Sequence, residues 1–112
     1  MNINIEVNEK PDITEVSIAG ELDIYTAPEL KKVFEPVAAD GTSSLHVDLK
    51  ELSYMDSTGL GLFVGTLKDL NRNDKELRVT NVQPRIMKLF EITGLRDLMY
   101  ITEYSEGEEV EK

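Results

Sequence analysis

Ser57 is the residue whose type and position best suit it to chemistry. It lies in the segment Asp56-Ser57-Thr58-Gly59-Leu60-Gly61, after which apolar residues recur at the helical spacing of three and four. Asp56 and Ser57 compete for the N-cap, the position whose side-chain oxygen accepts a free backbone N–H. Either way, the Ser57 hydroxyl lies at the positive end of a helix, where a phosphate is stabilised. A serine placed there is a good acceptor for a phosphoryl group.

The same segment also has a purely structural interpretation. Serine and threonine are common as caps alone, and glycines can pack a helix closely against a sheet. Gly59 and Gly61 each cost helix propensity of about 1 kcal/mol, but they allow another backbone or protein to approach closely. The segment is therefore either a capping cluster or a binding site, and the rest of the chain must decide.

Catalytic and metal-binding groups are sparse. The single histidine, His46, lies in an apolar strand pattern, and without Cys or a second His it has no companion for a metal site. The signatures Gly-x-Ser-x-Gly, P-loop and Gly-x-Gly-x-x-Gly are missing. Asp23 and Asp56 could pair for acid–base work, but a chain with 22 Asp and Glu residues offers many such pairs. We expect no enzyme, no cofactor and no metal.

Size and charge limit the partners. The chain has 112 residues, 40 % of them hydrophobic, and we expect one domain over residues 1–104 and an acidic, flexible tail over 105–112. The formal net charge of −10 disfavours nucleic acid and anionic membranes and favours a partner with a basic face. There is no Cys, no leader-like segment and no run of about 20 apolar residues. We expect a monomer in the cytoplasm.

The elements that position Ser57 follow from the hydrophobic periodicity. Alternation predicts strands at 3–7 and 13–18 that pair as an antiparallel hairpin, and Gly20 is expected to break the second strand. A short apolar piece at 22–24 follows, and then a strand at 44–49. After the central helix, strands are predicted at 77–80 and at 98–101, the last of them at an edge of the sheet. Strand 44–49 is expected to lead directly into the Ser57 motif. Thr26 and Glu29 have the spacing of a capping box at the start of the first helix.

Three helices are predicted between these strands. Their inward residues are Leu30, Val33, Phe34 and Val37; then Leu60, Phe63, Val64, Leu67 and Leu70; then Ile86, Leu89, Phe90 and Ile92. The alternation of strands and helices predicts an α/β fold with a mixed β-sheet, largely parallel with an antiparallel N-terminal edge, and helices mainly on one face. Functional groups gather at the carboxyl ends of such strands. If the strands ending near Ile24 and Leu49 are neighbours, Asp23, Tyr25, Asp56 and Ser57 converge at one edge.

Two motifs together resemble a known family. Asp56-Ser57-Thr58-Gly59-Leu60-Gly61, preceded by Val47-Asp48-Leu49 and by Gly20-Glu21-Leu22-Asp23, is similar to the anti-sigma-factor antagonists of the STAS domain family. The resemblance extends from Ile5 to Leu95, and it implies a single-domain STAS-like fold. The general-stress branch is the most similar, because Thr58 follows Ser57 where sporulation relatives more often have a second serine.

The resemblance implies a switch between partners. The unphosphorylated protein would bind an anti-sigma factor that is also a serine kinase, and so release the sigma factor. The kinase would phosphorylate Ser57 with ATP, which abolishes binding, and a PP2C-type phosphatase would reverse the modification. Asp23 and Asp56 match acidic positions near the phosphorylated serine, and Thr58 and Gly59 match a turn that contacts the partner. These four residues and Tyr25, which is expected at the same edge, form the predicted partner-binding set of five.

A STAS-like module could also bind a nucleotide or another small ligand, or act as a scaffold in a signalling assembly. Gly59 and Gly61 beside a helix N-terminus favour this alternative, since they could cradle a phosphate. The absence of Lys and Arg from the motif argues against it.

Overall fold

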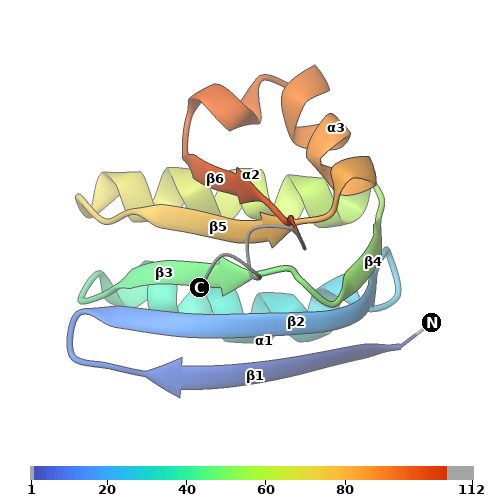
Figure 1. The fold of residues 1–112 in the computed structure, drawn as a ribbon. Coiled ribbons are helices and arrows are strands. Elements are labelled where there is room, and N and C mark those ends of the chain that lie inside the picture. The colour runs from blue at the N-terminus through green and yellow to red at the C-terminus, as the bar shows by residue number, and fades with distance from the viewer. Residues whose placement is uncertain (1, 106–112) are drawn as a thin grey trace.

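One mixed β-sheet with helices packed on it makes up the described part of the chain, residues 2–105 of a computed structural model (Figure 1). In chain order the elements are β1 (Ile3–Glu9), β2 (Ile13–Leu22), α1 (Ala27–Asp40), β3 (Ser44–Asp48), β4 (Leu52–Met55), α2 (Ser57–Arg72), β5 (Leu77–Val82), α3 (Pro84–Ile92), the 3₁₀ turn η1 (Leu95–Asp97) and β6 (Tyr100–Glu103). The predicted α/β class is confirmed. The predicted tail lies, except for Ser105, outside the described residues.

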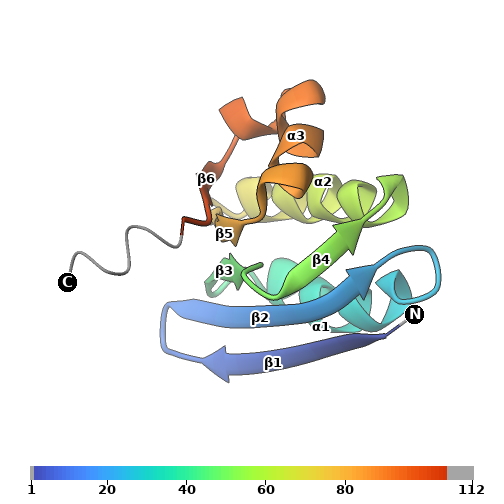
Figure 2. The same ribbon diagram turned by 45° about the vertical axis from the view of Figure 1, so that its right-hand side comes forward.

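The sheet is parallel except at its first edge. Its strand order is β1-β2-β3-β5-β6, with β4 paired to the end of β2 (Figures 1 and 2). β1 runs antiparallel to β2, with Ile3 opposite Gly20 and Val7 opposite Val16, as the predicted hairpin requires. The pairs β2–β3, β2–β4, β3–β5 and β5–β6 are parallel. Parallel pairing brings the carboxyl ends of β2 and β4 to the same edge.

Gly20 does not end the second strand, so that prediction is wrong. β2 continues through Gly20 to Leu22, and the register of its pairing with β4 shifts between Gly20 and Glu21. Gly20 has φ +105°, and an added Cβ would lie 2.4 Å from the Asn2 carbonyl oxygen. Glycine therefore lets the strand bend and change partners from β3 to β4. The separate piece predicted at 22–24 is the end of β2 and the turn after it.

A strand absent from the prediction, β4, leads into α2. β3 ends at Asp48, and the chain turns through Lys50 and Glu51 before β4 begins. Only Leu52 and Met55 of β4 are buried, so the strand lacks the alternation by which strands are found in a sequence. Strand 44–49 was therefore correctly predicted as an element but does not reach the Ser57 motif.

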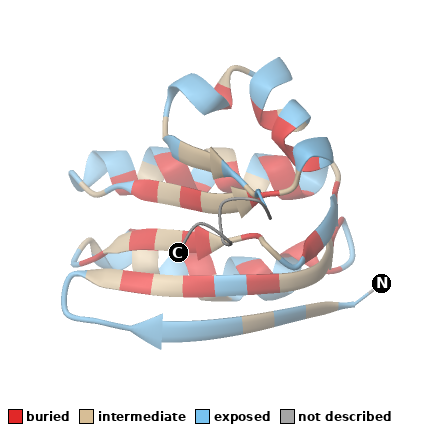
Figure 3. Ribbon diagram, in the orientation of Figure 1, coloured by how far each residue is buried: buried red, intermediate tan, exposed pale blue. Residues whose placement is uncertain are grey.

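The core lies between the sheet and the helices, which pack on the same face as predicted. Buried residues alternate along β2, β3 and β5, and α1 and α2 lie behind these strands (Figure 3). The Phe63 ring of α2 contacts Phe34 of α1 and Phe90 of α3 edge to face, with centroids 5.5 and 5.9 Å apart. Such pairs stabilise beyond the area they bury. One aromatic residue of α2 thus joins all three helices.

α3 and the chain after it differ from the prediction in two details. Ile92 is 81 % exposed rather than inward-facing, and Met87 is buried in α3 instead. At helical spacing, Ile92 falls on the side of α3 opposite the buried Ile86, Met87 and Phe90. The final strand starts at Tyr100 rather than Leu98, because Gly94, with φ +80°, turns the chain into η1 first. β6 does form the predicted edge strand.

Candidate phosphorylation and partner-binding site

The carboxyl ends of β2 and β4 bring the two predicted acidic segments together. Leu22 of β2 is in register with Met55 of β4, and the Asp56 N–H donates to the Leu22 carbonyl at 3.2 Å. Asp23 and Asp56 are the residues that follow these two paired positions. The predicted convergence at one edge is therefore present, although the neighbour of β2 that creates it is β4 and not the strand ending near Leu49.

Asp56 is the N-cap of α2. Its Oδ1 accepts from the backbone N–H groups of Thr58 and Gly59 at 2.9 and 3.1 Å, and its carbonyl accepts from Leu60 at 3.0 Å. Asp56 has the extended backbone of a cap, with φ −108° and ψ −172°. The competition between Asp56 and Ser57 is thus decided for Asp56.

Ser57 is the first residue of α2, and it is exposed. Because the Asp56 carboxylate satisfies the free N–H groups, the Ser57 hydroxyl has no capping role. Within residues 2–105, no group hydrogen-bonds to that hydroxyl. It is a free side chain at the positive end of a 16-residue helix.

The two glycines of the motif have different surroundings. Gly59 is buried, and an added Cβ would lie 2.7 Å from Cγ of Leu22 and 3.1 Å from Cγ of Met55. Gly61 is exposed, and nothing lies within 4 Å of an added Cβ. Contact with β2 and β4 therefore accounts for Gly59, whereas no contact within the described chain accounts for Gly61.

Asp23 organises the turn between β2 and α1. Its side chain is buried, and Oδ1 accepts from the N–H groups of Tyr25 and Thr26 at 2.8 and 3.0 Å. The Thr26 hydroxyl accepts from the Asp23 N–H at 2.9 Å and donates to the Glu21 carbonyl at 2.8 Å. This turn leaves Ile24 and Tyr25 60 % and 79 % exposed. Two large side chains thus project beside the start of α2.

The predicted capping box is wrong. Thr26 precedes α1 with helical rather than extended angles, φ −98° and ψ −19°, and its hydroxyl makes no cap hydrogen bond. The hydroxyl is used instead within the Asp23 turn. Asp23 was singled out for its charge, and its role as the acceptor of the turn was missed. An Asp placed between a strand and a helix is typical of an Asx turn, in which its side chain accepts the N–H two residues on, and this position could have indicated the role.

Other site chemistry is limited. Among residues 2–105, no three His, Asp or Glu side chains are grouped to hold a metal ion, and none of the helices is long and apolar enough to cross a membrane. The pKa of Glu15 is lowered, first by a hydrogen bond from Lys10 and then by one from Asn8. Glu15 alternates with the buried residues of β2 and thus faces away from the helices. It has no part in the site.

Comparison with known proteins decides the family. The model of the STAS domain matches residues 4–109. The chain belongs to the STAS domain family. This confirms the resemblance carried by the Ser57 motif and the Gly20–Asp23 segment.

Curated relatives in this STAS family cover nearly the whole chain. It is 58 % identical over 111 residues to the anti-sigma-B factor antagonist of Staphylococcus aureus (strain NCTC 8325 / PS 47), which spans 99 % of this chain and 100 % of the relative. It is 57 % identical over 111 residues to the protein of the same name from Staphylococcus epidermidis, with the same coverage. These relatives are regulatory binding proteins rather than enzymes.

Solved STAS structures share the fold. An anti-sigma factor antagonist from Mycobacterium paratuberculosis superposes with TM-score 0.80 at 25 % identity, covering 97 % of this chain and 92 % of that one. The Bacillus cell fate determinant SpoIIAA in its phosphorylated form gives TM-score 0.75 at 21 % identity, covering 96 % and 97 %. The second likeness concerns the fold alone.

Proposed function

We propose that this STAS protein is an anti-sigma-factor antagonist whose binding is switched off by phosphorylation of Ser57. Its unphosphorylated form binds an anti-sigma factor that is also a serine kinase, and the sigma factor is released. The relatives named anti-sigma-B factor antagonist support the regulatory class. The observation that carries the site assignment is the exposed Ser57 side chain at the start of α2, with Asp56 as the cap.

The phosphoryl transfer uses the kinase's ATP. The Ser57 Oγ attacks the γ-phosphorus, the bond from that phosphorus to the β–γ bridging oxygen breaks, ADP leaves and the hydroxyl proton passes to a base of the kinase. A PP2C-type phosphatase, with its own metal-activated water, hydrolyses the phosphoserine. This protein supplies the accessible hydroxyl and a rigid helix end. It acts in the cytoplasm as a monomer.

Charge explains why the modification prevents binding. A phosphate adds about −1.5 to −2 charges at pH 7 beside the Asp56 carboxylate. The N-terminus of α2 tolerates the phosphate, because the aligned peptide dipoles of the helix stabilise an anion there. An interface that must lose water against Ser57, Asp56 and Tyr25 does not tolerate it. A coupling of about 1–3 kcal/mol changes affinity by about 5- to 150-fold, and no refolding is needed.

The remaining predicted residues have distinct parts in this proposal. Tyr25 is an exposed aromatic side chain of the kind enriched at binding hot spots. Thr58 is exposed beside Ser57 and contacts the partner directly. Asp23 and Gly59 are buried, so they act by holding the Tyr25 turn and the start of α2 in place.

The test is phosphorylation and binding with the purified anti-sigma factor. After incubation with ATP, mass spectrometry should find one phosphate on Ser57. Ser57→Ala should block modification and keep binding, whereas Ser57→Asp should weaken binding at least about fivefold. Ser17→Ala, at an exposed serine of β2 outside the site, is the matched control and should leave Ser57 modification intact. Modification at another residue with Ser57 untouched would reject the assignment, and equal binding by wild type and Ser57→Asp would reject the charge mechanism.

A further inference from the structure

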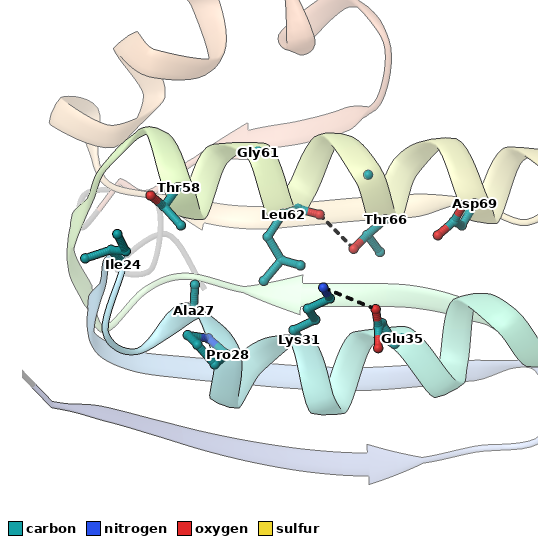
Figure 4. Close-up of a pocket in the computed structure, with 11 residues that line it drawn as sticks. Ile24, Ala27, Pro28, Lys31, Glu35, Thr58, Gly61, Leu62, Thr66 and Asp69 are labelled. Carbon is teal, nitrogen blue, oxygen red and sulfur yellow. Dashed lines mark hydrogen bonds and ion pairs between the residues drawn. The ribbon is translucent and has the colours of Figure 1, made fainter.

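A groove runs between α1 and α2 and starts at the end of α2 that carries Ser57. Its volume is about 520 Å³ (Figure 4). Ile24 and Thr58 lie at one end and Asp69 at the other, and Leu62 points into the space between the helices. The groove is therefore continuous with the proposed phosphorylation site.

The α2 wall is one continuous helical stripe. It consists of positions 58, 61, 62, 65, 66 and 69, a spacing that places them on one face of the helix. From Thr58 to Asp69 the stripe is about 16 Å long, or about three helical turns. The opposite wall comes from the start and middle of α1, including Ala27, Pro28 and Lys31. A three-turn helix matches this length.

Two glycines leave the α2 wall of the groove without side chains at two positions. Gly61 and Gly65 are four residues apart on the stripe, and apart from the adjacent backbone of α2 no atom lies within 4 Å of a Cβ added to either. Neither has a positive φ. Gly59, by comparison, is required by its contact with Leu22. Both glycines lower the helix propensity of α2, and no contact inside the described protein explains them. They leave the helix surface open to the close approach of another backbone.

The two ends of the groove differ in chemistry. Near Ser57, Ile24 is 60 % exposed, and the neighbouring Tyr25 is 79 % exposed. At the far end the carboxylates of Glu35 and Asp69 form ion pairs with Lys31 and Arg72, yet their side chains stay 64 % and 48 % exposed. An occupant complementary to both ends is apolar near Ser57 and basic near Asp69.

We infer that this groove binds a three-turn amphipathic helix of the anti-sigma factor, with small apolar residues against Gly61 and Gly65 and a Lys or Arg near Glu35 and Asp69. The inference rests on the proposed function and adds a second contact region to it. The helix-in-groove mode gives affinity through burial of apolar surface along the stripe. A phosphate on Ser57 lies at the entrance of this groove, so it opposes docking at the apolar end.

The test uses substitutions of Gly65 that place a side chain in the groove, and the first of them also raises the helix propensity of α2. Gly65→Ala should raise the melting temperature by roughly 4 °C, because alanine favours a helix and has free space here. The same change should weaken binding of the purified anti-sigma factor. Gly65→Leu should lower affinity at least about tenfold, as overfilling a packed contact does. Asn71→Leu, on another side of α2, is the matched control and should bind like wild type.

The charged end has its own variant pair. Asp69→Lys should lower affinity and reduce the salt dependence of binding. Glu6→Lys, on β1 and outside the groove, makes the same charge change and should leave affinity within about twofold. Equal effects of the two changes would overturn the predicted basic residue at the Asp69 end.

Failure of the inference differs from failure of the proposed function. If Ser57→Asp weakens binding but Gly65→Leu binds like wild type, the groove is not the docking site and the switch stands. If the wild-type protein does not bind the anti-sigma factor, the proposed function and the inference both fail. If Gly65→Leu instead abolishes a dimer of this protein seen by sedimentation, the occupant is a second copy, and the inference is overturned.

Discussion

At the residue scale, capping of α2 and the proposed acceptance of phosphate fall to two neighbouring residues, Asp56 and Ser57. Asp56 caps the helix, because its Oδ1 accepts two backbone N–H groups. The Ser57 hydroxyl is therefore not needed for capping. A residue that both capped the helix and accepted phosphate would have to rearrange its cap hydrogen bonds at each modification. The separation lets the hydroxyl change chemically while the start of α2 keeps its geometry.

This separation predicts unequal costs for two alanine substitutions. Asp56→Ala should lower the free energy of unfolding by about 1 kcal/mol, because the N–H groups of Thr58 and Gly59 lose their acceptor. Ser57→Ala should change it by less than about 0.5 kcal/mol, as for an exposed position without partners. Urea denaturation followed by circular dichroism measures both. Equal losses would mean that Ser57 shares the capping role.

At the element scale, α2 contains glycines that look alike in the sequence and act differently in the structure. Gly59 lies against β2 and β4, while Gly61 lies on the exposed side of the helix. The sequence predicts only that both remove bulk. Whether a glycine faces the sheet or the solvent depends on the rotation of α2 about its axis. That rotation is set by the packing of Leu60 and Phe63 in the core.

Matched alanine substitutions should therefore have opposite signs. Gly59→Ala should lower the free energy of unfolding by about 1–3 kcal/mol, since its Cβ would lie 2.7 Å from Leu22. Gly61→Ala should raise the same quantity by up to about 1 kcal/mol. Thermal and urea unfolding of both variants give the comparison. Stabilisation by Gly59→Ala would show that α2 can move away from β2 at little cost.

The limits of prediction also lie at this scale. Elements with regular alternation or helical spacing, such as β1, β3, β5 and the three helices, follow from local pattern. β4 does not, because four residues with Leu52 and Met55 buried carry no period. The bend at Gly20 depends on a contact with Asn2 that is distant in sequence. For the same reason the edge at which Asp23 and Asp56 meet was predicted with the wrong strand.

At the scale of the whole molecule, the proposed functional features lie close together, whereas the net charge is a property of the entire chain. The Asp23 turn, the Ser57 helix end and the α1–α2 groove adjoin one another, whereas the formal charge of −10 belongs to the entire chain. Surface charge contributes little to holding such a fold together. It acts over distance, by steering a partner whose binding face is basic.

Association with the anti-sigma factor should therefore slow as salt is added. Between about 10 mM and 150 mM ionic strength the Debye length falls from roughly 30 to 8 Å, so the association rate constant should fall at least about tenfold. The dissociation rate constant should change much less, because contacts within the interface are screened less than the long-range field. Stopped-flow mixing of the unphosphorylated protein separates the two constants. Glu6→Lys should slow association slightly without altering dissociation, since it changes the field and not the interface. An association rate that rises with salt would mean that the partner's face is acidic, and the net charge would then oppose recognition.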